Sequence, residues 1–219
     1  MDQVLSSLKS TLPCRGNQIE QLYNLFAYKD EPFVESIYIY GGPSTGKSIV
    51  VTSLLEKLGI KHAVVNLIEC YTSRILFETI LNKLSRHKMD PKKPLPYARC
   101  DNFMDFIISL QNMTEENDLN GSVLVLDKAE ELRNMDFNLL AGFLRFKELC
   151  GISISVIFLS EVVFEKYYSK TNIVEPIKLS FPQYNKDELL EILSLDIDNA
   201  KAMIMNSSGE LFDVDLDFL

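Results

Sequence analysis

The chain has 219 residues, 47% of them apolar and 24% charged, which is enough for one globular α/β domain with a substantial core. Its net charge of −9 argues against independent binding to nucleic acid through a large basic surface, because phosphate neutralisation supplies most non-specific affinity. The four cysteines and two histidines are not at metal-ligand or disulfide spacing, so we expect reduced thiols.

The N-terminal residues lack the features of a secretory signal. Residues 1–6 have neither the basic start nor the long apolar segment of a signal peptide. Nothing in the sequence approaches the ~20 consecutive apolar residues of a membrane span. We therefore expect a soluble intracellular protein with no membrane partner. The first predicted element is a helix over residues 17–26, which follows a turn-like stretch at 11–16 and has apolar residues at helical spacing.

The next element is an apolar strand over residues 36–40, which leads directly into a complete phosphate-binding loop. Its sequence, G-G-P-S-T-G-K-S, matches the pattern G-x-x-x-x-G-K-[ST]. The eight residues are Gly41, Gly42, Pro43, Ser44, Thr45, Gly46, Lys47 and Ser48. A helix over residues 48–57 follows, so the strand–loop–helix context of a true phosphate loop is present. The alternative is a chance glycine-rich turn.

Each part of this loop has a mechanical task. Gly41 and Gly46 allow backbone angles and close approaches that a Cβ would obstruct. The loop amides and the positive end of the helix would bind phosphates. Lys47, which we expect in a solvated loop, would reach the outer phosphates, and the Ser48 hydroxyl would bind Mg²⁺. We predict that the chain binds ATP with Mg²⁺.

The remaining elements alternate between strands and helices. Each strand is too apolar for an exposed sheet, which predicts a mostly parallel sheet covered on both faces. The predicted strands span residues 61–68, which we expect to be buried on both faces, 121–127, 153–159 and 177–181. The predicted helices span residues 71–84, 101–113 and 135–149, and a last helix begins after Asn185 as N-cap, with Glu188 three residues on. Residues 85–100 are predicted as a loop, and the acidic 207–219 as poorly ordered.

The strand over residues 121–127 supplies the second half of the site. It ends in Asp127, whose carboxylate would lie beside Ser48 and help to hold Mg²⁺. Most hydrolysing relatives place a glutamate next, to orient the attacking water, but here that position is Lys128. Glu130 is a candidate catalytic carboxylate, or else part of a charged helix face. Ser160 is a candidate contact to the terminal phosphate, or else a cap for the following helix. We expect weak or absent hydrolysis.

Several segments resemble the family of subunit 5 of the eukaryotic origin recognition complex. They are the phosphate loop, L-V-L-D-K-A-E-E-L-R at 124–133, N-L-L-A-G-F-L-R-F-K-E-L at 138–149, F-L-S-E-V-V-F-E-K at 158–166, P-C-R-G-N-Q-I-E-Q-L at 13–22 and I-E-C-Y-T-S-R at 68–74. The likeness runs from about residue 11 to residue 193. The Asp-Lys-Ala-Glu and Phe-Leu-Ser-Glu tetrapeptides are more specific than the phosphate loop.

The resemblance implies a three-layer α/β P-loop NTPase fold of the AAA+/ASCE type, with a five-stranded sheet. It implies a nuclear subunit of a hetero-oligomer that encircles origin DNA and helps to load the replicative helicase. It assigns Pro13, Cys14 and Arg15 to the surroundings of the adenine and ribose. We expect an AAA+ core over residues 1–183, and at 184–219 only the start of a helical lid and an acidic tail. The lid would then be largely missing.

Other functions and roles stay open at this point. A small-molecule or nucleotide kinase would share the phosphate loop but would need clustered arginines, whereas the arginines here are dispersed. A signalling scaffold switched by ATP would share the site but not the two tetrapeptides. The basic segment 86–99 is either a DNA contact or a solvated loop. Arg145 is either an arginine finger or a surface residue.

Overall fold

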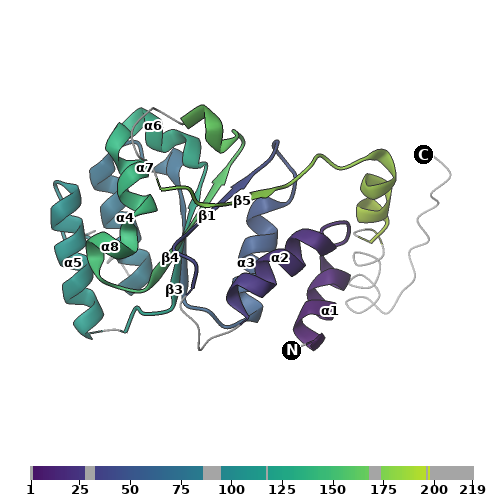
Figure 1. Cartoon of the computed structure of the whole chain (residues 1–219), viewed down its shortest axis with the longest axis horizontal. Helices are drawn as coiled ribbons and strands as arrows, with labels where there is room; N and C mark the ends of the chain where they lie inside the picture. The colour runs from purple at the N-terminus through teal and green to yellow at the C-terminus, as the bar shows by residue number, and fades with distance from the viewer. Residues whose placement is uncertain are drawn as a thin grey trace, which may run out of the picture.

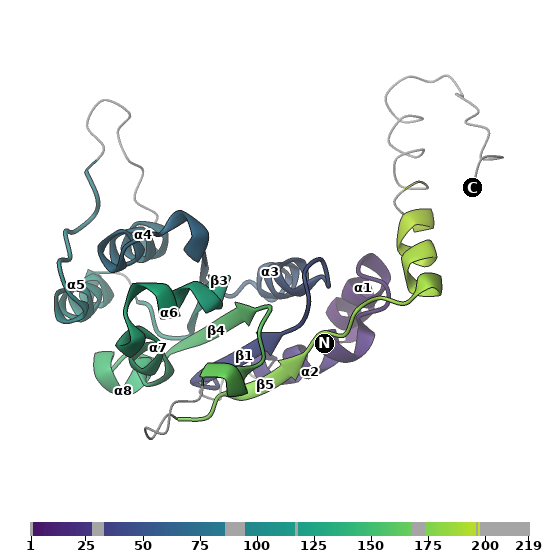
Figure 2. The ribbon, with the colours of Figure 1, turned by 90° about the horizontal axis from the view of Figure 1, so that it is seen from above.

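The computed structural model describes residues 2–27, 33–85, 95–116, 118–167, 174–195 and 197. Within these ranges five parallel strands form one sheet in the order β2-β3-β4-β1-β5. The strands are β1 (Ser36–Tyr40), β2 (His62–Asn66), β3 (Ser122–Asp127), β4 (Ile154–Ser160) and β5 (Ile177–Ser180). Helices cover both faces, so the molecule has three layers, as Figure 1 and Figure 2 show. The predicted α/β fold class is confirmed.

The side chains of the central strands alternate between two separate cores, because successive residues of a strand point to opposite faces. Tyr38 and Phe158 belong to the core on one face, and Ile37 and Ile157 to the core on the other. On the first face lie α4 (Ser73–Ser85), α5 (Phe103–Glu116), α6 (Leu132–Met135), α7 (Phe137–Leu144) and α8 (Phe146–Cys150). On the second face lie α1 (Asp2–Thr11), α2 (Gly16–Phe26) and α3 (Lys47–Lys57).

The strand β2 is shorter and less buried than predicted. It ends at Asn66 and continues as the 3₁₀ turn η1 (Leu67–Glu69), and its residues alternate between buried and half-buried. The reason is its position at the edge of the sheet, where β3 is its one partner among the described strands. The expectation of burial on both faces holds instead for β4, all of whose residues are buried.

The predicted helix over residues 135–149 is wrong as one continuous element. The chain breaks at Asp136, which is extended (φ −153°, ψ 127°) and accepts a hydrogen bond from the Asn138 amide as the cap of α7. It breaks again at Arg145, between α7 and α8. Phe143 and Phe146 are nonetheless fully buried, so each short helix still presents its apolar face to the core.

Two features at the ends of the described residues complete the fold. The helix α1 was not predicted. A helix at 186–195 begins with a reciprocal capping box: the Glu188 amide donates to Asn185 Oδ1, and the Asn185 amide donates to Glu188 Oε2, each at 2.8 Å. Its predicted start is thus confirmed. Most of the basic segment, residues 86–94, and the acidic residues 207–219 lie outside the described residues. No helix within the described ranges is long and apolar enough to cross a bilayer.

Candidate functional site

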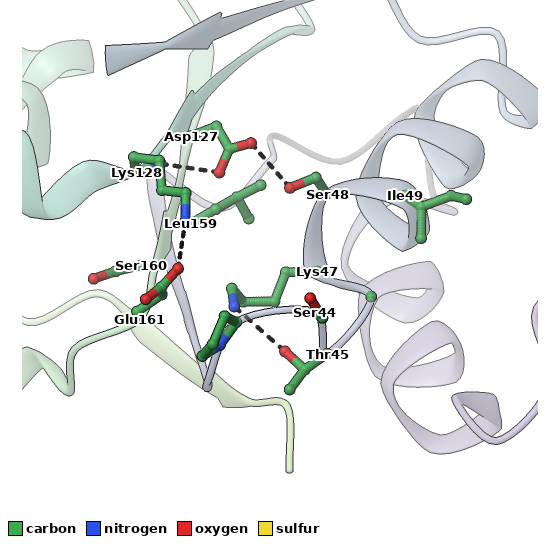
Figure 3. Close-up of a pocket in the computed structure, with 12 residues that line it drawn as sticks. Ser44, Thr45, Lys47, Ser48, Ile49, Asp127, Lys128, Leu159, Ser160 and Glu161 are labelled. Carbon is green, nitrogen blue, oxygen red and sulfur yellow. Dashed lines mark hydrogen bonds and ion pairs between the residues drawn. The ribbon is translucent and has the colours of Figure 1, made fainter. Parts of the chain in front are cut away.

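The predicted phosphate loop lies where the carboxyl ends of β1, β3 and β4 meet the start of α3. A cleft of about 180 Å³ opens between them (Figure 3). Its lining residues are Pro43, Ser44, Thr45, Gly46, Lys47, Ser48, Ile49, Asp127, Lys128, Leu159, Ser160 and Glu161. Most of the predicted phosphate-loop residues therefore line one cleft together with Asp127 and Ser160. Such a position, outside the carboxyl ends of parallel strands, is where α/β sheets bind ligands.

The glycines of the loop are required for two different reasons. Gly46 has φ +83°, in the left-handed region that favours glycine, and stands directly before α3. A Cβ on Gly41 would lie 2.2 Å from the backbone oxygen of Phe181. The segment 181–184, which follows β5, is therefore packed directly against the loop. This close approach could not be seen in the sequence.

Lys47 is not a solvated residue, contrary to our prediction. It is only 9% exposed, and its ammonium donates to the backbone oxygens of Gly41 (2.8 Å) and Gly42 (2.7 Å) and lies 3.3 Å from Thr45 Oγ1. Burial lowers its pKa. The lysine thus occupies the inside of its own loop, where it neutralises the carbonyl dipoles that the bent backbone turns inward. Glycine-rich loops of this sequence pattern, directly before a helix, bind phosphates through their backbone amides.

Ser48 and Asp127 are brought together as predicted. Ser48 Oγ donates to Asp127 Oδ2 at 3.0 Å, although the two residues are 79 positions apart. The other carboxylate oxygen, Oδ1, accepts the Lys128 amide at 2.9 Å, which fixes the orientation of the acid (Figure 3). A hydroxyl and a carboxylate oxygen are ligands that Mg²⁺ accepts, so these two side chains fit a magnesium bound beside a phosphate.

The residues after β3 and β4 form a charged cluster on the side of the cleft opposite the phosphate loop. The Lys128 ammonium is ion-paired with the Glu161 carboxylate, and this contact raises the pKa of Lys128 and lowers that of Glu161. Glu130 lies in the 3₁₀ turn η2 (Ala129–Glu131), where its carboxylate accepts the Glu161 amide at 3.3 Å. Glu130 is not among the residues that line the cleft.

Ser160 is fully buried at the end of β4. Its hydroxyl oxygen accepts the Val162 amide at 3.0 Å, so it caps the turn that follows the strand. The residues that follow form a bend and not the predicted helix, so Ser160 is not a helix cap. Ser160 also lines the cleft, and its contact to the terminal phosphate stays a prediction. Glu161 was missed as a site residue. The signal was present, because Glu161 directly follows a buried strand, and Asp127 was identified as an acid that ends one.

The N-terminal turn contains a buried arginine that fastens three segments together. Arg15 is 2% exposed and donates to the Thr45 oxygen of the loop (3.0 Å) and to the Pro182 oxygen (2.7 Å). Its guanidinium also lies 3.7 Å from the ring centre of Tyr184. Arg15 thus acts on the phosphate loop from behind and does not line the phosphate cleft.

A second hollow, of about 390 Å³, lies beside this arginine and the first turn of α3. It is lined by Ser10, Thr11, Leu12, Pro13, Arg15, Ile49, Val50, Tyr184, Ile192 and Leu195. Ile49 lines both the hollow and the cleft, so the two are neighbours. Cys14 lines neither: its thiol is directed to the 186–195 helix, where it lies 3.8 Å from the Glu188 oxygen and 3.4 Å from Glu191 Oε2. Arg145 is exposed at the α7–α8 junction, outside the cleft.

Comparison with known proteins gives a consistent result. The family model of the AAA ATPase domain matches residues 11–158. Origin recognition complex subunit 5 of Homo sapiens is 40% identical over 191 residues, which are 86% of this chain and 44% of that protein. The Drosophila melanogaster subunit 5 is 36% identical over 216 residues, 96% of this chain and 45% of that protein. The chain therefore spans less than half the length of these relatives.

Solved structures agree with the sequence comparison. A chain in the structure of Drosophila ORC bound to DNA superposes with a TM-score of 0.79 at 34% identity, covering 94% of this chain and 52% of the other. Cdc6p from Pyrobaculum aerophilum superposes with a TM-score of 0.64 at 23% identity, over 87% of this chain and 50% of the other, which shows the common fold. The resemblance found in the sequence is confirmed.

Proposed function

The chain belongs to the AAA ATPase domain family and is similar to origin recognition complex subunit 5, and from this premise we propose that it is an ATP-binding subunit of an origin recognition complex. The observation that supports ATP binding best is the joint arrangement of the loop, Ser48 and Asp127 around one cleft. Two oxygen ligands for Mg²⁺ and the phosphate-loop residues 43–48 then line the same cleft.

The two hollows on either side of Ile49 suggest where the parts of the nucleotide bind. The triphosphate and Mg²⁺ occupy the cleft, with Ser48 and Asp127 as the protein's metal ligands. The adenine and ribose occupy the larger hollow, where Pro13 and Ile49 offer apolar contact and Tyr184 offers an aromatic ring. Arg15 lines this hollow too, and it also supports the arrangement through its contacts with Thr45 and Tyr184.

Hydrolysis by the chain alone is weak or absent in this proposal. Catalysis requires a carboxylate that is free to orient an attacking water. Lys128 stands where such an acid would follow Asp127, the Glu161 carboxylate is ion-paired with Lys128, and Glu130 is bonded to the Glu161 amide outside the cleft. ATP then acts as a bound structural element.

The partners are other subunits of the same complex, and origin DNA is held by the assembly in the nucleus. The relatives' names and the Drosophila complex with DNA support this. With a net charge of −9, the chain is suited to DNA contact only together with other subunits.

Titration calorimetry with ATP, in the presence and absence of Mg²⁺, tests the nucleotide site. The chain should bind ATP. Ser48→Ala should lower the affinity for ATP about 10–100-fold with Mg²⁺ but little without it, because the substitution removes one protein ligand of the metal. Ser53→Ala, a serine farther along α3, serves as the matched control. If the folded chain shows no ATP binding even together with its neighbouring subunits, the proposal is wrong.

Membership of the complex needs its own experiment. A pull-down from nuclear extract should recover other origin recognition subunits, and recovery should depend on ATP. Recovery of signalling proteins without any origin recognition subunit would favour the alternative of a signalling scaffold switched by ATP. A phosphotransfer assay with nucleoside monophosphates tests the kinase alternative, and phosphoryl transfer there would contradict our proposal.

A further inference from the structure

Lys128 has an unusual backbone conformation for a lysine. Its φ of 60° and ψ of 48° lie in the left-handed region, which side chains with a Cβ rarely adopt. The hydrogen bond from its amide to Asp127 Oδ1 holds it there. Strained residues persist only where the surrounding structure maintains them, and they cluster at functional sites. The strain keeps the Lys128 side chain on the wall of the phosphate cleft.

Glu161 positions the lysine from the neighbouring strand end. The two strands β3 and β4 are paired, with Asp127 opposite Leu159, so the residues that follow them lie side by side. The Lys128 and Glu161 side chains are 37% and 33% exposed, and their ion pair therefore faces the solvent in the cleft. An ammonium has three N–H donors and can bind a second anion without leaving Glu161.

The charges around the cleft explain why this lysine is needed there. Among the described residues that line the cleft, four are charged: Lys47 and Lys128 are positive, and Asp127 and Glu161 are negative. Lys47 donates to carbonyls of its own loop, and Asp127 is bonded to Ser48. Glu161 by itself would repel a phosphate that enters from the solvent. Lys128 is the lining cation that can both cancel this charge and attract the phosphate.

We propose that Lys128, held in place by Glu161, binds the terminal phosphate and makes the site select nucleoside triphosphate over diphosphate. This inference rests on the proposed ATP site and adds a specificity residue to it. Lys128 contacts only the phosphate that distinguishes ATP from ADP. Glu161 is then a positioning residue, not a ligand of the nucleotide.

The test compares the dissociation constants of ATP and ADP, each with Mg²⁺, by calorimetry. Lys128→Met should reduce the preference for ATP at least tenfold, which corresponds to about 1.4 kcal/mol. The double variant Lys128→Met/Glu161→Gln should show the same reduced preference, because removing Glu161 restores charge balance but not the contact. Lys128→Arg should keep most of the preference. Lys166→Met, an exposed lysine outside the cleft, is the matched control.

Three results would overturn the inference. An unchanged preference in Lys128→Met would show that the lysine does not contact the terminal phosphate. Recovery of the full preference in the double variant would show that Lys128 only neutralises Glu161. Absence of ATP binding by the wild-type chain would remove the proposed function itself, and the inference with it. Thermal melting of each variant verifies that it is folded.

Discussion

Replacing Arg15 by methionine should destabilise the chain, although Arg15 does not line the phosphate cleft. Methionine keeps most of the apolar stem but removes two charge-assisted hydrogen bonds, to the Thr45 and Pro182 oxygens, and the stacking on Tyr184. Each such hydrogen bond contributes about 1.5–3 kcal/mol. The cation–π contact contributes about 0.5–2 kcal/mol. Relief of the buried charge offsets part of the loss, so we expect a net loss of about 2–4 kcal/mol.

For a domain of this size each kcal/mol lowers the melting temperature by about 2–4 °C, so Arg15→Met should melt roughly 5–15 °C below the wild type. Circular dichroism of the nucleotide-free chain measures this. Arg133→Met, an exposed arginine on α6, should change the free energy of unfolding by less than about 0.5 kcal/mol. If Arg15→Met melts within about 1 °C of this control, the guanidinium does not fasten the three segments as we describe.

Two further predictions concern the loop and the thiols. Gly41→Ala should lower both the melting temperature and the affinity for ATP, because its Cβ would meet the Phe181 oxygen at 2.2 Å. Gly16→Ala is the control and should lower neither, because the nearest neighbour of its Cβ is 3.9 Å away. Equal effects of the two substitutions would contradict the close packing at Gly41. Brief maleimide labelling should modify Cys14 alone in the folded chain, because Cys70, Cys100 and Cys150 are buried, and mass spectrometry should find all four labelled after unfolding. Burial and Glu191 raise the pKa of Cys14, so its labelling rate should rise about tenfold per pH unit between pH 7 and 8; a rate independent of pH would refute this reasoning.

The parts of the site that could be predicted are those encoded locally. A buried strand ending in Asp127 and a strand ending in the phosphate loop have to meet at the same edge of a parallel sheet, and so Ser48 and Asp127 are in contact. The capping box at Asn185 and Glu188 depends only on residues three apart. Such features follow from periodicity and from short-range hydrogen bonding.

The parts that could not be predicted depend on tertiary packing. Nothing near Arg15 in the sequence indicates that its partners lie at residues 45 and 182, and an arginine is ordinarily expected at the surface. The burial of Lys47 was missed for the same reason, because its partners are backbone oxygens that the bend of the loop turns toward it. The break at Arg145 was not predicted, because Phe143 and Phe146 on either side of it keep a helical spacing.

The hydrogen bond between Arg15 and Pro182 spans 167 positions, and it has a consequence for biosynthesis. A nascent polypeptide emerging from the ribosome exposes its phosphate loop long before the segment that supports it has been translated. Contacts of such high contact order form late in folding. We therefore expect the loop to bind nucleotide only after residue 184 has left the exit tunnel. ATP binding by ribosome-stalled chains of increasing length would then report when folding is complete.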